Sequence, residues 1–406
     1  MTRAILAAAL TAGLALTAAC GTDGTRSPSM ATGKPALTIG IAYHQPGLSV
    51  MDSGGKPQGF DADTARYIAD KLGALPEKIT WKEVAPDQRE QVLTSGAVDF
   101  VVATYSITTG RMERVTFAGP YLVTGQDLLV RKDDPSINRP EDLGGRSVCT
   151  AQGTTAADNL RAFTPEVNLT TREGYSACVD DLLAGTVDAV STDDVILAGY
   201  AAQHPDRLRL TGYRFTKERY GVGIKKGDTG LQGKITQAIR DMIADGSWEK
   251  SISTHLTPEG YQPQPAPAVF NAPDKTVTAG DPADLDQDLV TAVDSLVENF
   301  NKQDWEAFGQ LTCPEAKDDI DRFVMRNTPR YDERLGPELA DAGFVTTVTG
   351  IQQTGSDAAA FLAREAFTNV PDKYRRYFAD IDYTGVMERR DGQWKLCQLS
   401  ADFVQP

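Results

Sequence analysis

The chain has few of the residues that metal sites require. Its three histidines, His44, His204 and His255, are far apart in the sequence, and its five cysteines include no C-x-x-C pair. Zinc sites use cysteine and histidine at short, regular spacings. The sequence therefore predicts no metal site, and we expect no cofactor.

Basic residues are also scarce. The sequence has 41 Lys and Arg against 56 Asp and Glu, a formal net charge of −15. It lacks a basic stripe of the kind that displaces counterions from phosphates, which excludes nucleic acid as a partner. It also lacks the G-x-x-x-x-G-K-[ST] pattern of nucleotide-binding loops, so any chemical energy must come from other proteins.

The apolar run at the start of the chain, residues 4–19 after Arg3, is too short and alanine-rich for a membrane span. It leads into Leu16-Thr17-Ala18-Ala19-Cys20-Gly21, which resembles a bacterial lipobox, where a small residue precedes a lipidated cysteine. We expect a lipoprotein signal peptide over residues 1–19, a lipid on Cys20 and a flexible tether over 20–35. An ordinary signal peptide that happens to contain a cysteine is the alternative.

Residues 36–257 alternate short β-branched runs with amphipathic stretches, which predicts an α/β fold. Residues 37–41 read as a strand. Asp61 is expected to cap a helix that ends near Gly73. The apolar face of this helix is formed by Ala65, Ile68, Ala69 and Leu72.

A weak repeat, L-x-x-G-x-V-D-x-V, occurs at residues 93–101 and 182–190. In each copy a helix is expected to stop at the glycine, and a buried strand follows. Ligands of open α/β sheets gather beyond the carboxyl ends of the strands. The stretches that follow, Thr104-Tyr105-Ser106 and Ser191-Thr192-Asp193-Asp194, should therefore face a cleft.

After residue 257 the sequence changes character. Residues 258–283 are rich in proline and predict an extended linker, whereas 284–406 place helices before strands, the order of an α+β domain. Strands are expected at residues 344–351, 358–368, 376–388 and 393–398. With Cys20 lipidated, four cysteines remain for an oxidising compartment, and these domain boundaries favour the pairs Cys149 with Cys178 and Cys313 with Cys397.

The first module carries several motifs in a characteristic order, and through them it resembles the family 3 solute-binding proteins of amino-acid ABC importers, in particular the actinobacterial glutamate and glutamine binders. The motifs are Gly59-Phe60-Asp61-Ala62-Asp63, Ala103-Thr104-Tyr105-Ser106-Ile107-Thr108-Thr109-Gly110-Arg111, Phe117-Ala118-Gly119-Pro120-Tyr121, Gln152-Gly153-Thr154-Thr155 and Val187-Asp188-Ala189-Val190-Ser191-Thr192-Asp193.

The resemblance implies a bilobal periplasmic-binding-protein type II fold. Lobe 1 is expected at about 36–130 and 221–257 and lobe 2 at about 131–220, with crossings near 130–134 and 219–223. It also implies a monomer on the outer face of the bacterial cell membrane that delivers an amino acid to ABC permease and ATPase subunits. Sensing through a membrane partner is the alternative.

The resemblance assigns roles to individual residues. Arg111 matches the arginine that binds the α-carboxylate, with Ser106 and Thr155 as further donors, and Asp193 matches the acid that takes the ammonium group. An alternative makes Asp193 a helix cap and Asp194 the ligand. Four further residues are expected in the pocket, although Tyr105 fits the core equally well: Thr104, Tyr105, Thr192 and Gln45.

The side chain of the ligand stays undecided. Related glutamate binders carry a basic residue in the first strand-loop, where this chain has Ala42, and His44 or Gln45 could instead contact an amide. Glutamate, glutamine and asparagine all remain open. Dehydratase chemistry would replace the ammonium-binding acid, whereas Asp193 is retained, so we expect a binding protein and not an enzyme.

The C-terminal module resembles the NTF2-like domains of actinobacterial lipoproteins. The resemblance is one of pattern, helices followed by a curved sheet, and of the ending Asp391-Gly392-Gln393-Trp394-Lys395-Leu396-Cys397. Such a fold by itself implies no particular activity.

Overall fold

The computed structural model describes residues 35–164, 166–267, 269, 285–316, 343–353, 356–371 and 380–403. The expected signal peptide, lipidation site and tether lie outside these residues, as does much of the expected linker. Within the described ranges no helix combines the length and apolar character that a membrane crossing requires.

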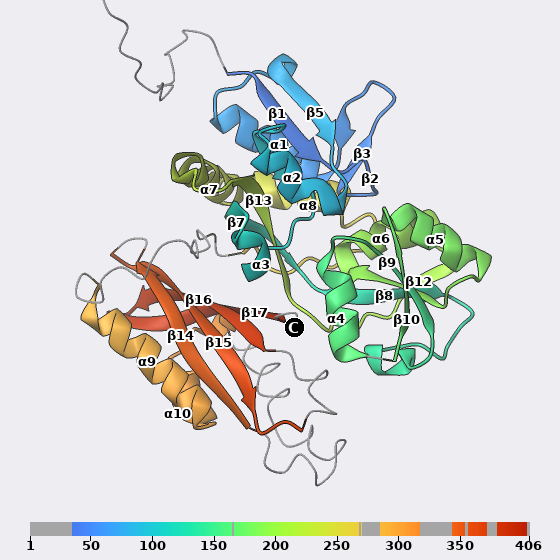
Figure 1. Ribbon diagram of the computed structural model, residues 1–406. Helices are drawn as coiled ribbons and strands as arrows, with labels where there is room; N and C mark the ends of the chain where they lie inside the picture. Colours follow the sequence, from blue (N-terminus) through green and yellow to red (C-terminus); the bar gives the residue numbers. More distant parts are fainter. Residues whose placement is uncertain are drawn as a thin grey trace, which may run out of the picture. The chain divides into compact units, whose positions relative to one another are not determined.

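The first sheet has five strands in the order β5-β1-β6-β13-β7. These are β1 Leu37–Ile41, β5 Ile79–Glu83, β6 Phe100–Val102, β7 Val115–Thr124 and β13 Glu218–Lys225. The helices α1 Phe60–Lys71, α2 Arg89–Thr94, α3 Thr109–Met112, α7 Thr229–Ala244 and α8 Ser247–His255 belong to this part of the chain (Figure 1). A small sheet of β2 His44–Gln45, β3 Ser49–Met51 and β4 Pro57–Gln58 accompanies them.

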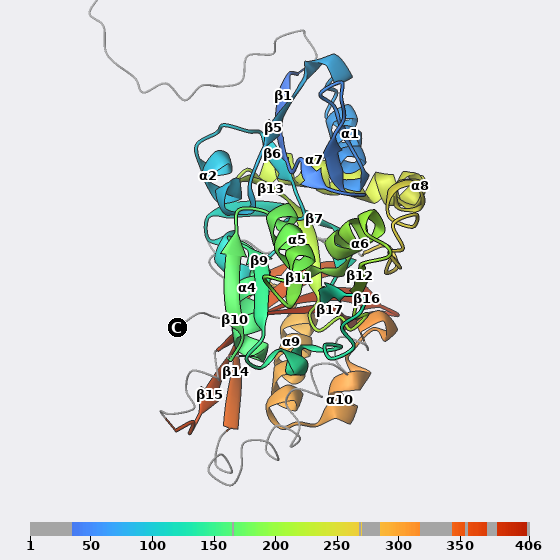
Figure 2. The ribbon, with the colours of Figure 1, turned by 90° about the vertical axis from the view of Figure 1, so that its right-hand side faces the viewer.

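The second sheet has the order β10-β9-β11-β8-β12. Its strands are β8 Gln126–Arg131, β9 Ser147–Ala151, β10 Asn168–Arg172, β11 Ala189–Asp193 and β12 Leu208–Leu210. The helices α4 Thr155–Phe163, α5 Tyr175–Ala184 and α6 Asp194–Gln203 pack around it (Figure 2). A disulfide joins Cys149 of β9 to Cys178 of α5, the pairing that the sequence favours.

The chain passes between the two sheets at positions that differ from the expected crossings near 130–134 and 219–223. Gly125 alone separates β7 of the first sheet from β8 of the second, and the return runs through residues 211–217. Residues 126–130 already pair in the second sheet, and residues 218–220 already pair in the first. The sequence places the boundaries wrongly because strands before and after a crossing have the same apolar character.

The first helix also corrects a prediction. Its N-cap is Gly59, and Asp61 lies inside the first turn with a fully buried side chain. The carboxyl group does not cap the helix: Oδ2 accepts a hydrogen bond from the backbone N–H of Thr104 at 2.9 Å and Oδ1 one from the hydroxyl of Tyr121 at 3.0 Å. Asp61 therefore holds Thr104, two residues after β6, in the segment that leads into the cleft.

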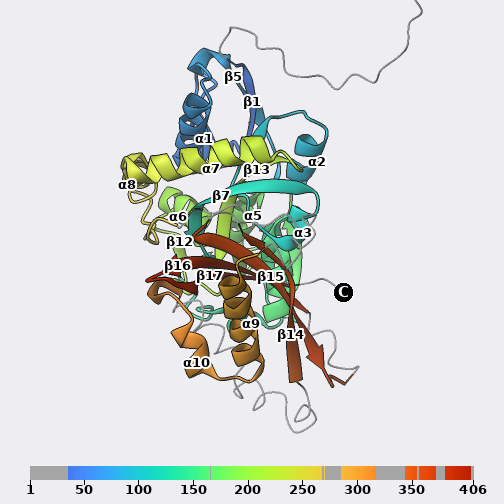
Figure 3. The same ribbon diagram turned by 90° about the vertical axis from the view of Figure 1, so that its left-hand side faces the viewer.

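The C-terminal domain begins with α9 Gln287–Asn301 and α10 Trp305–Gln310 and continues with an antiparallel sheet in the order β14-β15-β16-β17. The strands are β14 Gly343–Gln353, β15 Ala358–Thr368, β16 Ile381–Arg390 and β17 Gln393–Phe403. Both helices lie on one face of this sheet (Figure 3), and the face beneath them carries the apolar core. A second disulfide joins Cys313 to Cys397. The expected strand over 376–388 begins at Ile381 in the structure, and residues 372–379 lie outside the described ranges.

Candidate functional site

A polar pocket lies where loops from the two sheets meet. The first sheet contributes side chains that follow β5 and β6, and the second contributes side chains at the ends of β9 and β11 and at the starts of helices. This is the location that the strand-end rule predicts for a ligand of α/β sheets. The lining residues are Pro86, Arg89, Thr104, Ser106, Arg111, Thr154, Thr155, Tyr175, Thr192, Asp193 and Ile196.

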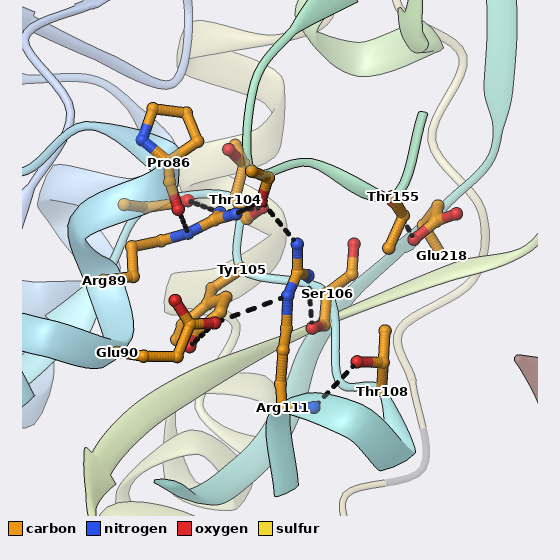
Figure 4. Close-up of polar contacts among 12 residues, drawn as sticks. Pro86, Arg89, Glu90, Thr104, Tyr105, Ser106, Thr108, Arg111, Thr155 and Glu218 are labelled. Carbon is orange, nitrogen blue, oxygen red and sulfur yellow. Dashed lines mark hydrogen bonds and ion pairs between the residues drawn. The ribbon is translucent and has the colours of Figure 1, made fainter. Parts of the chain in front are cut away.

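Arg111 extends from the short helix α3 into this pocket (Figure 4). The hydroxyl oxygen of Thr108 caps the helix by accepting the backbone N–H of Arg111 at 3.2 Å. The guanidinium donates from Nη1 to the carbonyl oxygen of Ser106 at 2.8 Å and from Nη2 to that of Gly153 at 3.0 Å. Glu90 Oε1 lies 3.7 Å from Nε. The planar group is therefore held in one orientation, which suits bidentate recognition of a carboxylate.

Arg89 is a second arginine in the pocket, and the sequence analysis did not identify it. Only 2% of its surface is exposed. It donates to four carbonyl oxygens, those of Pro86, Ala103, Thr104 and Gly153, at 2.9 to 3.2 Å. Burial and the neighbouring Arg111 lower its pKa to about 10, so it stays cationic at neutral pH. Among the described residues no carboxylate forms an ion pair with it. A signal existed: Arg89 follows β5, whose end also faces the cleft.

Tyr105 and Gln45 lie behind the pocket wall and do not line it. The ring of Tyr105 is fully buried, with the guanidinium carbons of Arg89 and Arg111 at 4.4 and 5.1 Å from its centroid. Its hydroxyl donates to Glu90 at 2.6 Å. Gln45 donates from Nε2 to the hydroxyl oxygen of Thr104 at 3.1 Å. Both expected pocket residues therefore support others that do reach the cavity.

Thr104 lines the pocket with a backbone that a threonine rarely adopts. Its φ of +44° lies in the left-handed region, which costs a non-glycine residue on the order of 1 kcal/mol or more. The carboxyl group of Asp61, the side chain of Gln45 and the guanidinium of Arg89 all bond to it. Burial raises the pKa of Asp61 to about 7. Conformational strain at this position is thus offset by three buried partners.

Asp193 closes the other side of the pocket. It ends β11, and only 5% of its surface is exposed. The hydroxyl of Tyr220 donates to Oδ2. Burial, followed by the nearby Glu218 carboxylate, raises its pKa well above the usual range. Neighbouring Asp194 instead accepts from Thr124 and pairs with Arg214. Of the two acids, the structure directs Asp193 to the cavity.

The remaining expected residues, Ser106, Thr155 and Thr192, all line the pocket. Thr155 opens α4, where unpaired backbone N–H groups and the helix dipole favour an anion, and its hydroxyl donates to Glu218 at 3.1 Å. The hydroxyl of Thr192 donates to the phenolic oxygen of Tyr175 at 2.6 Å. The pocket therefore combines donors for a carboxylate at one end with a carboxylate acceptor at the other.

The first strand-loop does not reach this pocket. Ala42 packs against a hydrophobic cluster, and the exposed imidazole of His44 lies 3.2 Å from Glu83. The residue that recognises the side chain of the ligand must therefore be another residue of the pocket lining. In the described part of the chain, no group of three or more His, Cys, Asp or Glu side chains is arranged to hold a metal.

Comparison with known proteins gives a consistent picture. Residues 37–258 match the family model of bacterial extracellular solute-binding proteins, family 3. The chain is 40% identical over 263 residues to the glutamate-binding protein GluB of Corynebacterium efficiens, covering 62% of this chain and 90% of that protein. It is 36% identical over 199 residues to the glutamine-binding protein GlnH of Bacillus subtilis, covering 49% and 72% of the two chains.

Solved structures show the same fold. An ancestral arginine-binding protein bound to arginine is 33% identical with a TM-score of 0.51, covering 54% of this chain and 97% of that chain. The solute receptor for L-cysteine of Neisseria gonorrhoeae is 27% identical with a TM-score of 0.52, covering 56% and 94%. These matches account for the part of the chain that contains the first two sheets.

Proposed function

The chain belongs to family 3 of the bacterial extracellular solute-binding proteins, and from that premise we propose that its cleft selects L-glutamate. A member of this family is an extracytoplasmic receptor for a small solute and not an enzyme. Its relatives are named for glutamate, glutamine and other amino acids, so the family by itself leaves the side chain open.

The observation that carries the proposal is that both Arg89 and Arg111 line the same pocket. These two cations face a single lining carboxylate, Asp193, so the lining has a formal charge of +1 when all three are ionised. An amino acid with a neutral side chain brings no net charge, whereas glutamate brings −1. Because an unpaired buried charge is costly, the lining favours a ligand with a second carboxylate.

The proposed pose follows from the same three residues. The α-carboxylate lies between Arg111, Ser106 and the start of α4, and the ammonium group donates to Asp193. The side-chain carboxylate then accepts a hydrogen bond from Arg89, whose other N–H groups already donate to carbonyl oxygens. Glu90, held by Tyr105, balances part of the positive charge behind the arginines. This partial balance makes the preference for glutamate over glutamine a matter of degree.

Calorimetric titration with a panel of amino acids tests this proposal. Glutamate should bind at least about tenfold more tightly than glutamine, a difference that corresponds to about 1.4 kcal/mol. Aspartate and asparagine serve as the shorter matched pair. Equal or tighter binding of glutamine would contradict the assignment of Arg89 while leaving amino-acid binding intact.

We also propose that the protein is anchored through a lipid on Cys20 and passes its ligand to an ABC permease with a cytoplasmic ATPase. The lipobox-like sequence and the family support this role. Metabolic labelling with an alkyne-tagged fatty acid should mark the natural chain and not Cys20→Ala. Labelling of the alanine variant would contradict anchoring at this position.

The C-terminal domain gives a second candidate role. Its two helices and four-stranded antiparallel sheet support an NTF2-like fold, and an extra domain could contact a membrane sensor. Deletion of residues 284–406 separates the roles. Unchanged glutamate uptake with a lost cellular response favours sensing, whereas a loss of uptake favours delivery to the permease.

A further inference from the structure

In the described part of the chain, the buried carboxyl groups follow a pattern with two exceptions. Asp61 and Asp127 are at most 1% exposed, and each has hydrogen-bond donors on both carboxyl oxygens. Among the described residues, Asp193 has a hydrogen-bond donor on Oδ2 alone, and its side chain lines the ligand pocket. The other exception is Glu365 in the C-terminal domain.

Glu365 is completely buried, and its Oε1 has no hydrogen-bond partner among the residues that the structure describes. Its Oε2 accepts a hydrogen bond from the hydroxyl of Tyr383 at 2.9 Å. Asp193 and Tyr220 show the same arrangement. In both cases a tyrosine hydroxyl donates to one carboxyl oxygen, and the other oxygen has no donor among the described residues. An unpaired buried oxygen is unfavourable in a purely structural core, where both oxygens are normally satisfied.

The strand register places a second unpaired group beside Glu365. Thr346 of β14 is the direct partner of Glu365 on β15, and its hydroxyl is buried with no hydrogen-bond partner within the described ranges. The two side chains share the sheet face that the helices cover, since alternate residues Phe361 and Ala363 belong to the core there. Glu365 Oε1 and the Thr346 hydroxyl are thus adjacent polar groups on one face, and neither has a partner within the described residues.

Aromatic rings surround this face. Phe344 and Phe367 form the next pair along the same two strands and are partly exposed. The ring of Phe300 lies 5.5 Å from Phe344 and 6.0 Å from Tyr383. Aromatic faces attract organic cations, and a carboxylate complements the cationic head. Phe344 and Phe367 lie between Glu365 and the end of the two strands, where their rings present an apolar surface.

From these contacts we propose that the C-terminal domain has its own ligand site, in which Glu365, Thr346 and Tyr383 bind the ammonium head of a small organic cation with an apolar body. The head donates to Glu365 Oε1 and to the hydroxyl oxygen of Thr346. The apolar body packs on Phe344 and Phe367. This site is separate from the amino-acid pocket and does not depend on which amino acid that pocket selects.

Phenethylammonium is a suitable probe, titrated by calorimetry into the whole protein with glutamate held in excess so that the first pocket is occupied. Saturable binding to the natural chain is expected, with at least a tenfold loss in Glu365→Gln. The matched control is Glu388→Gln on β16, where the side chain pairs with Arg390 and should not affect the probe. Asp193→Asn should abolish amino-acid binding and leave probe binding unchanged.

Two outcomes would overturn the proposal: absence of saturable probe binding to the natural chain, or equal binding to Glu365→Gln. Carbon-13 NMR of the Glu365 carboxyl gives an independent measurement, and probe binding should shift its resonance. If Glu365→Gln unfolds, Tyr383→Phe is tested in its place. This variant keeps the Glu365 carboxyl group but removes the hydroxyl that donates to its Oε2. Binding to that variant should weaken severalfold, and unchanged binding would count against the site.

Discussion

Arg89 and Arg111 donate from their Nη2 atoms to the same acceptor, the carbonyl oxygen of Gly153, at 3.1 and 3.0 Å. The arginines belong to the first-sheet side and Gly153 follows β9 of the second. A single carbonyl group therefore joins both arginines of the pocket to its opposite wall. We expect approach of the two walls to depend on this carbonyl group, alongside other contacts between them such as that of Gln152 with Asp87.

Substitution of Gly153 should prevent that approach. A Cβ atom at this position would lie 2.5 Å from the Cα of Asp87, and the φ of +73° disfavours any side chain. We expect Gly153→Ala to weaken glutamate binding by about 10- to 100-fold in calorimetry, roughly 1.4 to 2.8 kcal/mol. Gly144→Ala, which has open space around its Cβ, is the matched control. Natural affinity in the Gly153 variant would show that this contact is dispensable.

Loss of the Arg111 side chain should abolish binding of every amino acid, because each presents the same α-carboxylate. We expect Arg111→Ala to lower affinity by at least about 100-fold for glutamate and glutamine alike, the effect of losing charge-assisted hydrogen bonds. Arg114→Ala on the exposed side of the same segment should bind normally. Retained binding in the Arg111 variant would mean that the carboxylate lies elsewhere.

Arg89 should instead decide between side chains. In Arg89→Gln the affinity for glutamate should fall by about 100-fold, whereas glutamine should change by less than about tenfold, since only the first ligand brings a second carboxylate. The ratio of the two affinities is the informative quantity, because general damage to Thr104 and its neighbours would lower both. A parallel loss for both ligands would assign Arg89 a purely structural role.

The raised pKa of Asp193 predicts that binding depends on pH. In the free protein, burial and Glu218 keep this carboxyl protonated over pH values at which an exposed aspartate is ionised. The ligand ammonium requires the ionised form, so a proton must leave on binding. Affinity should therefore fall as the pH is lowered through the raised pKa of Asp193. Calorimetry in buffers with different ionisation enthalpies should detect proton release, and proton uptake would reverse this reasoning.

Glu365 should make the C-terminal domain less stable as the pH rises. Burial raises its folded-state pKa to about 7, above the value of about 4.3 for an unperturbed glutamate. The native state binds the extra proton, so stability falls between about pH 4 and pH 7 and then levels off, by at most about 4 kcal/mol. In Glu365→Gln this part of the dependence should disappear. Thermal unfolding at several pH values measures it, and parallel curves for the two proteins would contradict the prediction.

Elements whose residues carry a local pattern could be predicted before the fold was known. Alternating or continuous apolar runs predicted the strands at residues 37–41 and 358–368 with the bounds that the structure gives. The change of pattern after residue 284 predicted helices before strands, the order in which α9 and the C-terminal sheet occur. The role of Arg111 came from a resemblance to a known family, whereas polar stretches after two buried strands pointed to Thr104, Ser106 and Asp193. These signals are local because burial on one face fixes the period of the side chains.

Residues that act together across long stretches of sequence could be identified from the folded chain alone. The position of Arg89 after β5 is a weak signal by itself, and its role emerges only where the fold brings it beside Arg111. Tyr105 and Gln45 support the wall of the pocket instead of lining it. Asp61 resembles a helix cap, yet the fold buries it against Thr104. Burial and hydrogen-bond partners separated by dozens of residues leave no local period, so these roles follow from packing alone.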